Sequence, residues 1–185
     1  MVRDLATELR TYCQKPFALF GHSLGALIAF ELARLLQSEA LLPVHLFLSG
    51  YGAPHLPGKL PPMHHLDDAG FLAALQELGT TPPAVLADEE LLALLLPMLR
   101  ADFSVYEQYQ FQAAEPLPIP ITLLGGKRDP LVTPEMLAAW QVHSRQPGGM
   151  HLFAGDHFYL QGQETAVWRI IRQVCQASQT TKFNE

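Results

Sequence analysis

The chain has 185 residues, of which 49% are hydrophobic and 16% are charged, and its formal net charge at pH 7 is −6. This length and composition favour one globular domain with a real hydrophobic core and exclude a disordered segment. The acidic balance, without a basic cluster, argues against binding to nucleic acid or to an anionic membrane surface. The N-terminus is typical of an amphipathic helix and not of a signal peptide, and no apolar run is long enough to cross a membrane, so we expect a cytoplasmic protein.

The first predicted elements surround a short motif. A helix is expected over residues 2–14, and Pro16 ends it before a short apolar strand over residues 17–20. Residues 21–25 match G-x-S-x-G, and an apolar-periodic helix is expected from about residue 23 to residue 38. A strand, this turn and a helix in succession are typical of a nucleophile elbow, which presents a serine hydroxyl at the top of a parallel sheet.

Ser23 is the candidate nucleophile of this elbow. The main-chain N–H of Leu24, at the positive end of the following helix, is the expected donor to an oxyanion. We expect Gly21 and Gly25 to keep the strand and the helix from colliding. A simple Gly/Ser turn is the alternative, but the flanking strand and helix favour the elbow.

The next segments contain a possible lid. A strand is predicted over residues 44–50, followed by a loop over residues 51–65 that is rich in proline and glycine. The loop holds His55, His64 and His65, but no Asp, Glu or Cys stands with them at a recognised ligand spacing, which favours a polar loop over a metal site. Helices are expected over residues 67–112, with a kink at Pro97. A helical lid insertion at about residues 60–115 is the favoured interpretation, and an extra helical layer is the alternative.

The remaining elements complete an α/β pattern. Strands are predicted over residues 121–126 and 150–153, and helices from Pro134 to His143 and from about residue 164 to residue 177. Because strands alternate with helices throughout, we expect an α/β fold with a mostly parallel sheet in a single domain over residues 1–185.

Two further side chains complete a candidate catalytic triad. Asp129 follows the third predicted strand and His157 follows the fourth, so both lie at the sheet edge expected for Ser23. His157 would act as the base and Asp129 would orient it. Asp156 competes with Asp129, but its position next to the base makes the far ring nitrogen hard to reach. The competing histidines are less suitable by their predicted places in the elbow, a helix and a strand: His22, His143 and His151.

At these motifs the chain resembles the stand-alone (type II) thioesterases of nonribosomal peptide and polyketide synthetases, which have the α/β-hydrolase fold. The resemblance implies Ser23 as nucleophile, His157 as base and Asp129 as acid, with Gly155-Asp156 where the family usually has two glycines. It also implies a helical lid that controls access, and a substrate carried on the phosphopantetheine of an acyl or peptidyl carrier protein domain. We expect no cofactor and no metal. The matching stretches are residues 16–34, 45–50, 53–57, 95–103, 120–126, 129–130, 139–140 and 155–159.

The resemblance also implies a difference at the N-terminus. Family members carry roughly 60–70 more residues there, including a glycine-rich loop that supplies the second oxyanion donor. On that basis the fold is expected to be an N-terminally truncated α/β-hydrolase, weakly active or poorly soluble by itself. Two alternatives to a carrier-directed thioesterase stay open: a carboxylesterase or lipase-like serine hydrolase, and a truncated, non-catalytic module that docks a carrier protein.

Overall fold

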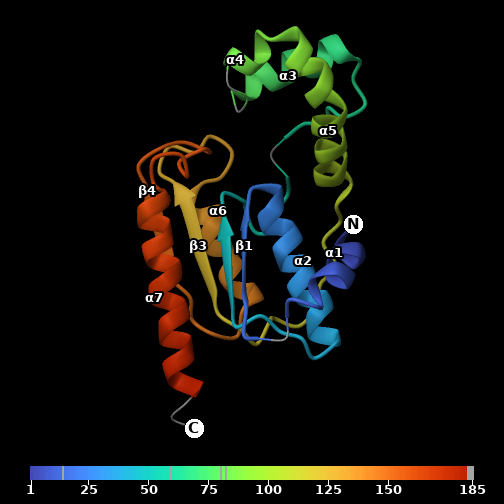
Figure 1. Cartoon of the computed structure of the whole chain (residues 1–185). Helices are drawn as coiled ribbons and strands as arrows, with labels where there is room; N and C mark the ends of the chain where they lie inside the picture. The colour runs from blue at the N-terminus through green and yellow to red at the C-terminus, as the bar shows by residue number, and fades with distance from the viewer. Residues whose placement is uncertain (14, 59, 80, 82, 183–185) are drawn as a thin grey trace. The chain divides into compact units, whose positions relative to one another are not determined.

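The computed structural model describes residues 1–13, 15–58, 60–79, 81 and 83–182 (Figure 1). The chain divides into two compact units. One unit comprises residues 1–56 and 113–185, and the other comprises residues 57–112. The role of the second unit as a lid stays a prediction.

A parallel sheet of four strands forms the centre of the first unit. Its strands run in sequence order β1-β2-β3-β4, and every neighbouring pair is parallel. The carboxyl ends of all four strands therefore lie at one edge of the sheet, as the α/β prediction requires. The strands are β1 (Ala18–His22), β2 (His45–Ser49), β3 (Ile121–Gly126) and β4 (Met150–Phe153).

Helices bury the apolar faces of this sheet. Phe47 of β2 and Leu124 of β3 pack with Tyr159 and with Val167 of α7. A second cluster joins α1 to α2 through Ala6, Leu32 and Leu36. The helices of this unit are α1 (Val2–Leu9), α2 (Leu24–Ser38), α6 (Pro134–Ala138), the 3₁₀ helix η1 (Ala139–His143) and α7 (Glu164–Lys182).

The second unit is helical. It contains α3 (Asp68–Leu78), α4 (Pro83–Leu86) and α5 (Glu89–Gln108). The side chain of Asp67 accepts from Gly70 N–H at the start of α3, and Asp88 does the same for Leu91 N–H at the start of α5. Pro97 lies inside α5, and the helix continues through it without a break.

Some predicted boundaries are wrong. The first helix ends at Leu9 instead of residue 14, and the last runs to Lys182 instead of residue 177. The helix expected from Pro134 to His143 is α6 followed by the tighter η1, because helix ends readily adopt 3₁₀ geometry.

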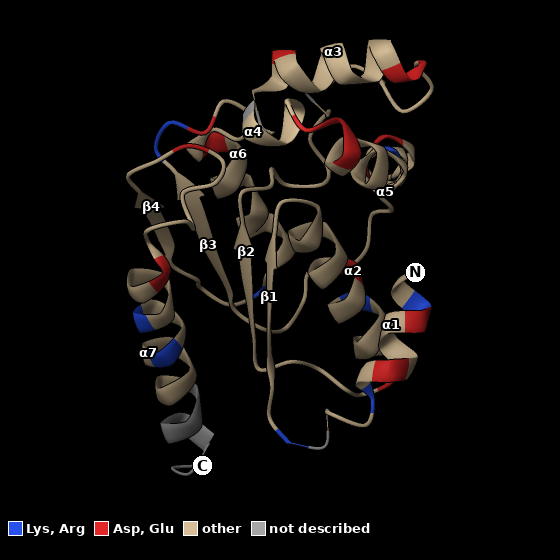
Figure 2. Cartoon of the chain, turned by 45° about the horizontal axis from the view of Figure 1, so that its top comes forward, with Lys and Arg blue, Asp and Glu red and all other residues tan. Residues whose placement is uncertain are grey.

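Lys and Arg are distributed over separate elements, among them α1 and α7 (Figure 2). Within the described ranges, no helix is both long and apolar enough to span a membrane.

Candidate active site

The elbow lies between β1 and α2. β1 ends at His22 and α2 begins at Leu24, so Ser23 alone makes the turn. Its backbone has φ 54° and ψ −128°, a left-handed conformation that costs free energy for any residue with a Cβ atom. The Leu24 N–H belongs to the first turn of α2, where an N–H has no acceptor within its own helix. The strained turn thus presents a hydroxyl beside a helix N-terminus.

The two glycines of the motif play different parts. A Cβ atom added at Gly21 would lie 2.0 Å from the carbonyl oxygen of Gly25, a distance that no packing change around a fixed backbone can relieve. A Cβ atom added at Gly25 would meet nothing within 4 Å. The expectation that both glycines prevent a collision is therefore wrong for Gly25, because the close approach is between the Gly21 α-carbon and the backbone of α2.

This asymmetry predicts opposite effects of two alanine substitutions on stability. We expect Gly25→Ala to change the free energy of unfolding by no more than about 1 kcal/mol, and in the stabilising direction, because alanine restricts the unfolded chain. We expect Gly21→Ala to destabilise by several times that amount, on the order of 3 kcal/mol or more, because the elbow backbone must shift. Urea unfolding of both variants measures the difference, and equal destabilisation by the two would contradict it.

Ser23, His157 and Asp129 form a continuous hydrogen-bonded set. Ser23 Oγ lies 3.0 Å from Nε2 of His157, and Nδ1 of His157 lies 2.9 Å from Oδ2 of Asp129. The side chains of His157 and Asp129 are 7% and 1% exposed. The other oxygen of Asp129, Oδ1, accepts from the main-chain N–H groups of Leu131 and Val132. The carboxylate is therefore fixed in orientation and holds the imidazole toward the serine.

The sheet explains why these residues meet. Ser23 follows β1, Asp129 follows β3 and His157 follows β4, all at the carboxyl edge. The end of β3 and the loop after β4 approach closely, since a Cβ atom at Gly126 would lie 2.1 Å from the Asp156 carbonyl oxygen. A glycine at this position lets the two loops come together.

The competing candidates have other partners. Asp156 Oδ1 accepts from the main-chain N–H of Phe158 in its own loop. Nε2 of His143 lies 2.7 Å from Nδ1 of His55, and burial lowers the pKa of His143 to about 4. His151 lies within β4. Of the acidic candidates, Asp129 is the one hydrogen-bonded to His157.

A buried polar chain behind His157 was missed by the sequence reasoning. Nδ1 of His22 lies 2.8 Å from Ser49 Oγ, which in turn lies 2.6 Å from the Tyr159 hydroxyl. The rings of His22 and His157 are 5.1 Å apart. Burial, with a smaller contribution from neighbouring His157, lowers the pKa of His22 to about 4. A neutral imidazole thus packs beside the candidate base; only the place of His22 next to Ser23 hinted at it in the sequence.

The Ser49 hydroxyl contacts both His22 and Tyr159. We therefore expect its removal to destabilise the fold more than loss of the Tyr159 hydroxyl does. Ser49→Ala leaves both His22 Nδ1 and the buried Tyr159 hydroxyl without this partner, and we expect it to destabilise by about 2–4 kcal/mol. Tyr159→Phe removes one hydrogen bond and its hydroxyl together, and we expect about 1 kcal/mol. Chemical denaturation tests this ranking. A larger loss of unfolding free energy in Tyr159→Phe than in Ser49→Ala would show that these hydrogen bonds do not stabilise the fold through Ser49.

Residues suited to a metal ion lie elsewhere. Within the part of the chain that the structure describes, one group of three side chains places metal-ligating atoms within 4.8 Å of one another: His64, His65 and Glu107. All three belong to the unit of residues 57–112. The hydrogen-bonded set of Ser23, His157 and Asp129 therefore shares no residue with this group of possible metal ligands.

A parallel α/β sheet with serine, histidine and aspartate joined at its carboxyl edge defines a protein of the α/β-hydrolase type. The chain belongs to the thioesterase family, because the family's Thioesterase domain matches residues 1–175. It is 45% identical over 181 residues to the linear gramicidin dehydrogenase LgrE of Brevibacillus parabrevis, covering 96% of this chain and 69% of LgrE. It is 44% identical over 161 residues to the gramicidin S biosynthesis protein GrsT of Aneurinibacillus migulanus, covering 86% of this chain and 63% of GrsT.

Solved structures agree with this assignment. ClbQ from the colibactin NRPS/PKS pathway superposes with a TM-score of 0.90 at 32% identity, covering 97% of this chain and 77% of ClbQ. YbtT, a type II thioesterase from the yersiniabactin NRPS/PKS pathway, superposes with a TM-score of 0.83 at 35% identity, covering 96% of this chain and 73% of YbtT. The resemblance to type II thioesterases and the α/β-hydrolase fold class are confirmed.

Proposed function

We propose that this chain hydrolyses acyl thioesters carried on the phosphopantetheine of carrier protein domains, clearing acyl groups from a nonribosomal peptide or polyketide synthetase. The observation that carries the proposal is the unbroken contact from Ser23 through His157 to Asp129. Its setting in a type II thioesterase fold supports thioesters as substrates. The reaction needs no cofactor, and the cytoplasm, where synthetases work, is the proposed location.

Each member of the set has one role in the proposed reaction. His157 Nε2 takes the proton of Ser23 Oγ as that oxygen attacks the thioester carbonyl carbon. The carbon–sulfur bond then breaks, the pantetheine thiol leaves with the proton from His157, and an acyl group remains on Ser23. His157 next removes a proton from a water molecule, whose oxygen attacks the carbonyl carbon of the acyl-enzyme. The bond from that carbon to Ser23 Oγ then breaks, Oγ takes the proton back from His157, and a carboxylic acid is released.

The N-terminus of α2 is the proposed site that stabilises the negatively charged oxygen of the tetrahedral intermediate. The Leu24 N–H is free of an acceptor within its helix and lies one residue after the nucleophile. Together with the positive end of α2, it would lower the free energy of the tetrahedral intermediate. The helical unit of residues 57–112 is the proposed lid that controls access of the acyl chain.

The substrate class can be tested by comparing two kinds of ester. We expect a higher kcat/KM on acyl-phosphopantetheinyl carrier protein than on p-nitrophenyl esters with the same acyl group. The reverse order would favour the carboxylesterase alternative. A fluorophosphonate probe that labels the wild-type chain but not Ser23→Ala would support a serine nucleophile, whereas a folded, unlabelled wild-type chain would favour the non-catalytic carrier-docking alternative.

A further inference from the structure

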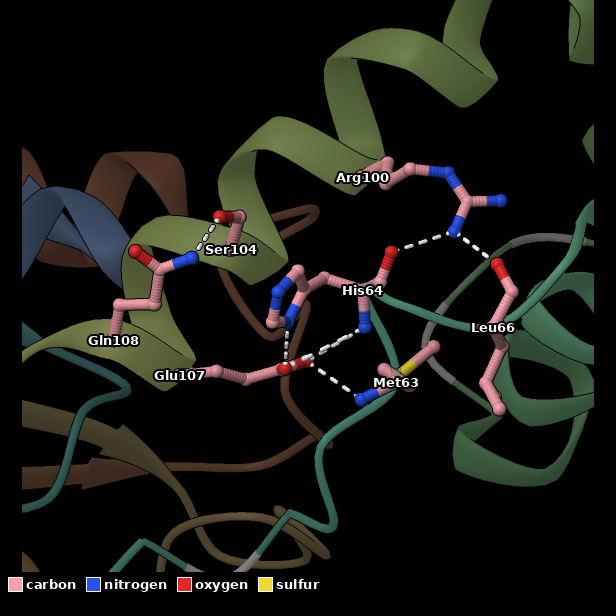
Figure 3. Close-up of polar contacts among 7 residues, drawn as sticks. All are labelled: Met63, His64, Leu66, Arg100, Ser104, Glu107 and Gln108. Atoms are coloured by element: carbon pink, nitrogen blue, oxygen red, sulfur yellow. Dashed lines mark hydrogen bonds and ion pairs between the residues drawn. The ribbon is translucent and has the colours of Figure 1, made fainter.

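A second cluster of ionisable side chains lies within the unit of residues 57–112 (Figure 3). Glu107 of α5 has a carboxylate that is only 5% exposed. Its Oε1 atom accepts from the main-chain N–H groups of Met63, at 2.8 Å, and His64, at 3.1 Å. Its Oε2 atom contacts Nδ1 of His64. The main-chain N–H groups therefore hold the carboxylate mainly through Oε1, and Oε2 faces the imidazole and lies 3.4 Å from the His64 main-chain nitrogen.

The loop segment that bears the histidines is fixed from a second side. Arg100, two turns before Glu107 on α5, donates to the carbonyl oxygens of His64 and Leu66 (Figure 3). Its other terminal nitrogen pairs with Asp68 at 2.7 Å. The contacts of Arg100 thus go to the loop carbonyls and to Asp68, while the side chain that contacts the Glu107 carboxylate is His64.

His65 adds a third ligand to this pair. Its ring is exposed and lies 5.8 Å from the ring of His64, nearly perpendicular to it at 83°. The ligating atoms of His64, His65 and Glu107 lie within 4.8 Å of one another. Two ligands of one tetrahedral Zn²⁺ ion lie about 3.4 Å apart, given metal–ligand bonds of about 2.0–2.1 Å. We expect rotation of the exposed His65 side chain to close this difference.

We propose that His64, His65 and Glu107 bind a divalent transition-metal ion, with Zn²⁺ the best match to two imidazoles and one carboxylate. The ion takes the place of the proton between His64 Nδ1 and Glu107 Oε2, and any proton carried by His64 is released to solvent. A water molecule fills the fourth position. The N–H groups of Met63 and His64 orient the carboxylate, as outer hydrogen bonds do in metal sites.

The bound ion has a structural consequence in its own unit. It links residues 64–65 to α5 and neutralises the buried charge of Glu107, so it should stabilise the unit of residues 57–112. The proposal does not depend on the thioesterase reaction, in which the ion takes no part.

Titration of the tag-free, chelator-treated full chain with ZnCl₂ by isothermal calorimetry at pH 7.5 tests the site. We expect one ion per chain, with a dissociation constant on the order of 1–10 μM, corresponding to about 7–8 kcal/mol. CoCl₂ should give the visible absorption of a low-coordinate Co²⁺ site. Affinity should fall as the pH is lowered to 5.5, because protons compete for the imidazoles.

Two variants separate this site from general binding by histidine. His65→Ala removes an exposed ligand with little risk to the fold, and we expect it to weaken Zn²⁺ binding by at least about tenfold. His151→Ala, in β4, removes one histidine outside the cluster and should leave the dissociation constant unchanged. At a Zn²⁺ concentration near the wild-type dissociation constant, Zn²⁺ should raise the melting temperature of the His151→Ala chain more than that of the His65→Ala chain.

Two results would overturn the proposal. One is the absence of saturable Zn²⁺ binding below about 1 mM, on the millimolar scale of weak binding. The other is equal binding by the His65→Ala and His151→Ala chains. Glu107→Gln should also weaken binding, and His65→Ala decides the question if loss of the Glu107 charge prevents folding.

Discussion

Replacing Ser23 with alanine is expected to lower kcat for thioester hydrolysis by about 10⁴-fold or more. The substitution removes the Oγ atom that lies 3.0 Å from Nε2 of His157, so no acyl-enzyme can form on this side chain. It keeps the Cβ atom, so the strain of the left-handed backbone at residue 23 is unchanged and the elbow should still fold. Single-turnover release of acid from an acyl-carrier protein measures the loss.

A matched serine substitution shows whether the loss is specific. Ser104 lies on α5, where its Oγ accepts from Gln108 at 2.9 Å, and it belongs to the unit of residues 57–112. Ser104→Ala should keep both hydrolysis and fluorophosphonate labelling near the wild-type level. Retention of more than about a tenth of wild-type kcat by a well-folded Ser23→Ala chain would exclude Ser23 as the nucleophile.

Asp129→Asn is expected to lower kcat by about 10⁴-fold while leaving the fold intact. The asparagine oxygen can still accept from the N–H groups of Leu131 and Val132, which now bind Oδ1. The amide NH₂ group then replaces Oδ2 opposite His157 Nδ1, where it cannot accept a hydrogen bond from Nδ1–H. The imidazole is forced into the tautomer that carries its hydrogen on Nε2, which cannot accept the Ser23 proton.

Asp156→Asn is the control for this substitution, because it changes the same chemical group next to the base. The Asp156 side chain accepts from Phe158 N–H in its own loop and not from His157, so we expect kcat within about threefold of wild type. Steady-state kinetics on one carrier substrate, with circular dichroism to compare the folds, distinguishes the two acids. A large loss in Asp156→Asn and a small one in Asp129→Asn would reverse their assignment.

The elements that position the triad could be predicted because their signals are local. Short apolar runs mark β1 to β4, and the G-x-S-x-G match places Ser23 between a strand and a helix. Once the strands are parallel, the order of Asp129 and His157 after β3 and β4 brings them to one edge. In this fold, the position of a residue directly after a strand is therefore enough to predict the sheet edge at which it lies.

The contacts that could not be predicted join residues that are far apart in the sequence and share no motif. Glu107 meets His64 across 43 residues, and Tyr159 meets Ser49 across 110, so neither partner is visible from the other's neighbourhood. The preference for a polar loop over a metal site depends on the lack of an Asp, Glu or Cys at a recognised ligand spacing from the histidines in the sequence. α5 supplies that acid from a distance. The freedom at Gly25 also depends on backbone positions that the motif alone does not define.

Because the triad residues follow three different strands, their reactivity depends on an intact sheet. Ser23 follows β1 while His157 follows β4, and two strands lie between them. A molecule whose β4 has detached would keep its elbow but lose its base, although most of its helices would remain. During urea titration, fluorophosphonate labelling should therefore disappear at or before the concentration that abolishes helical circular dichroism, which would make the serine a built-in sensor of partial unfolding.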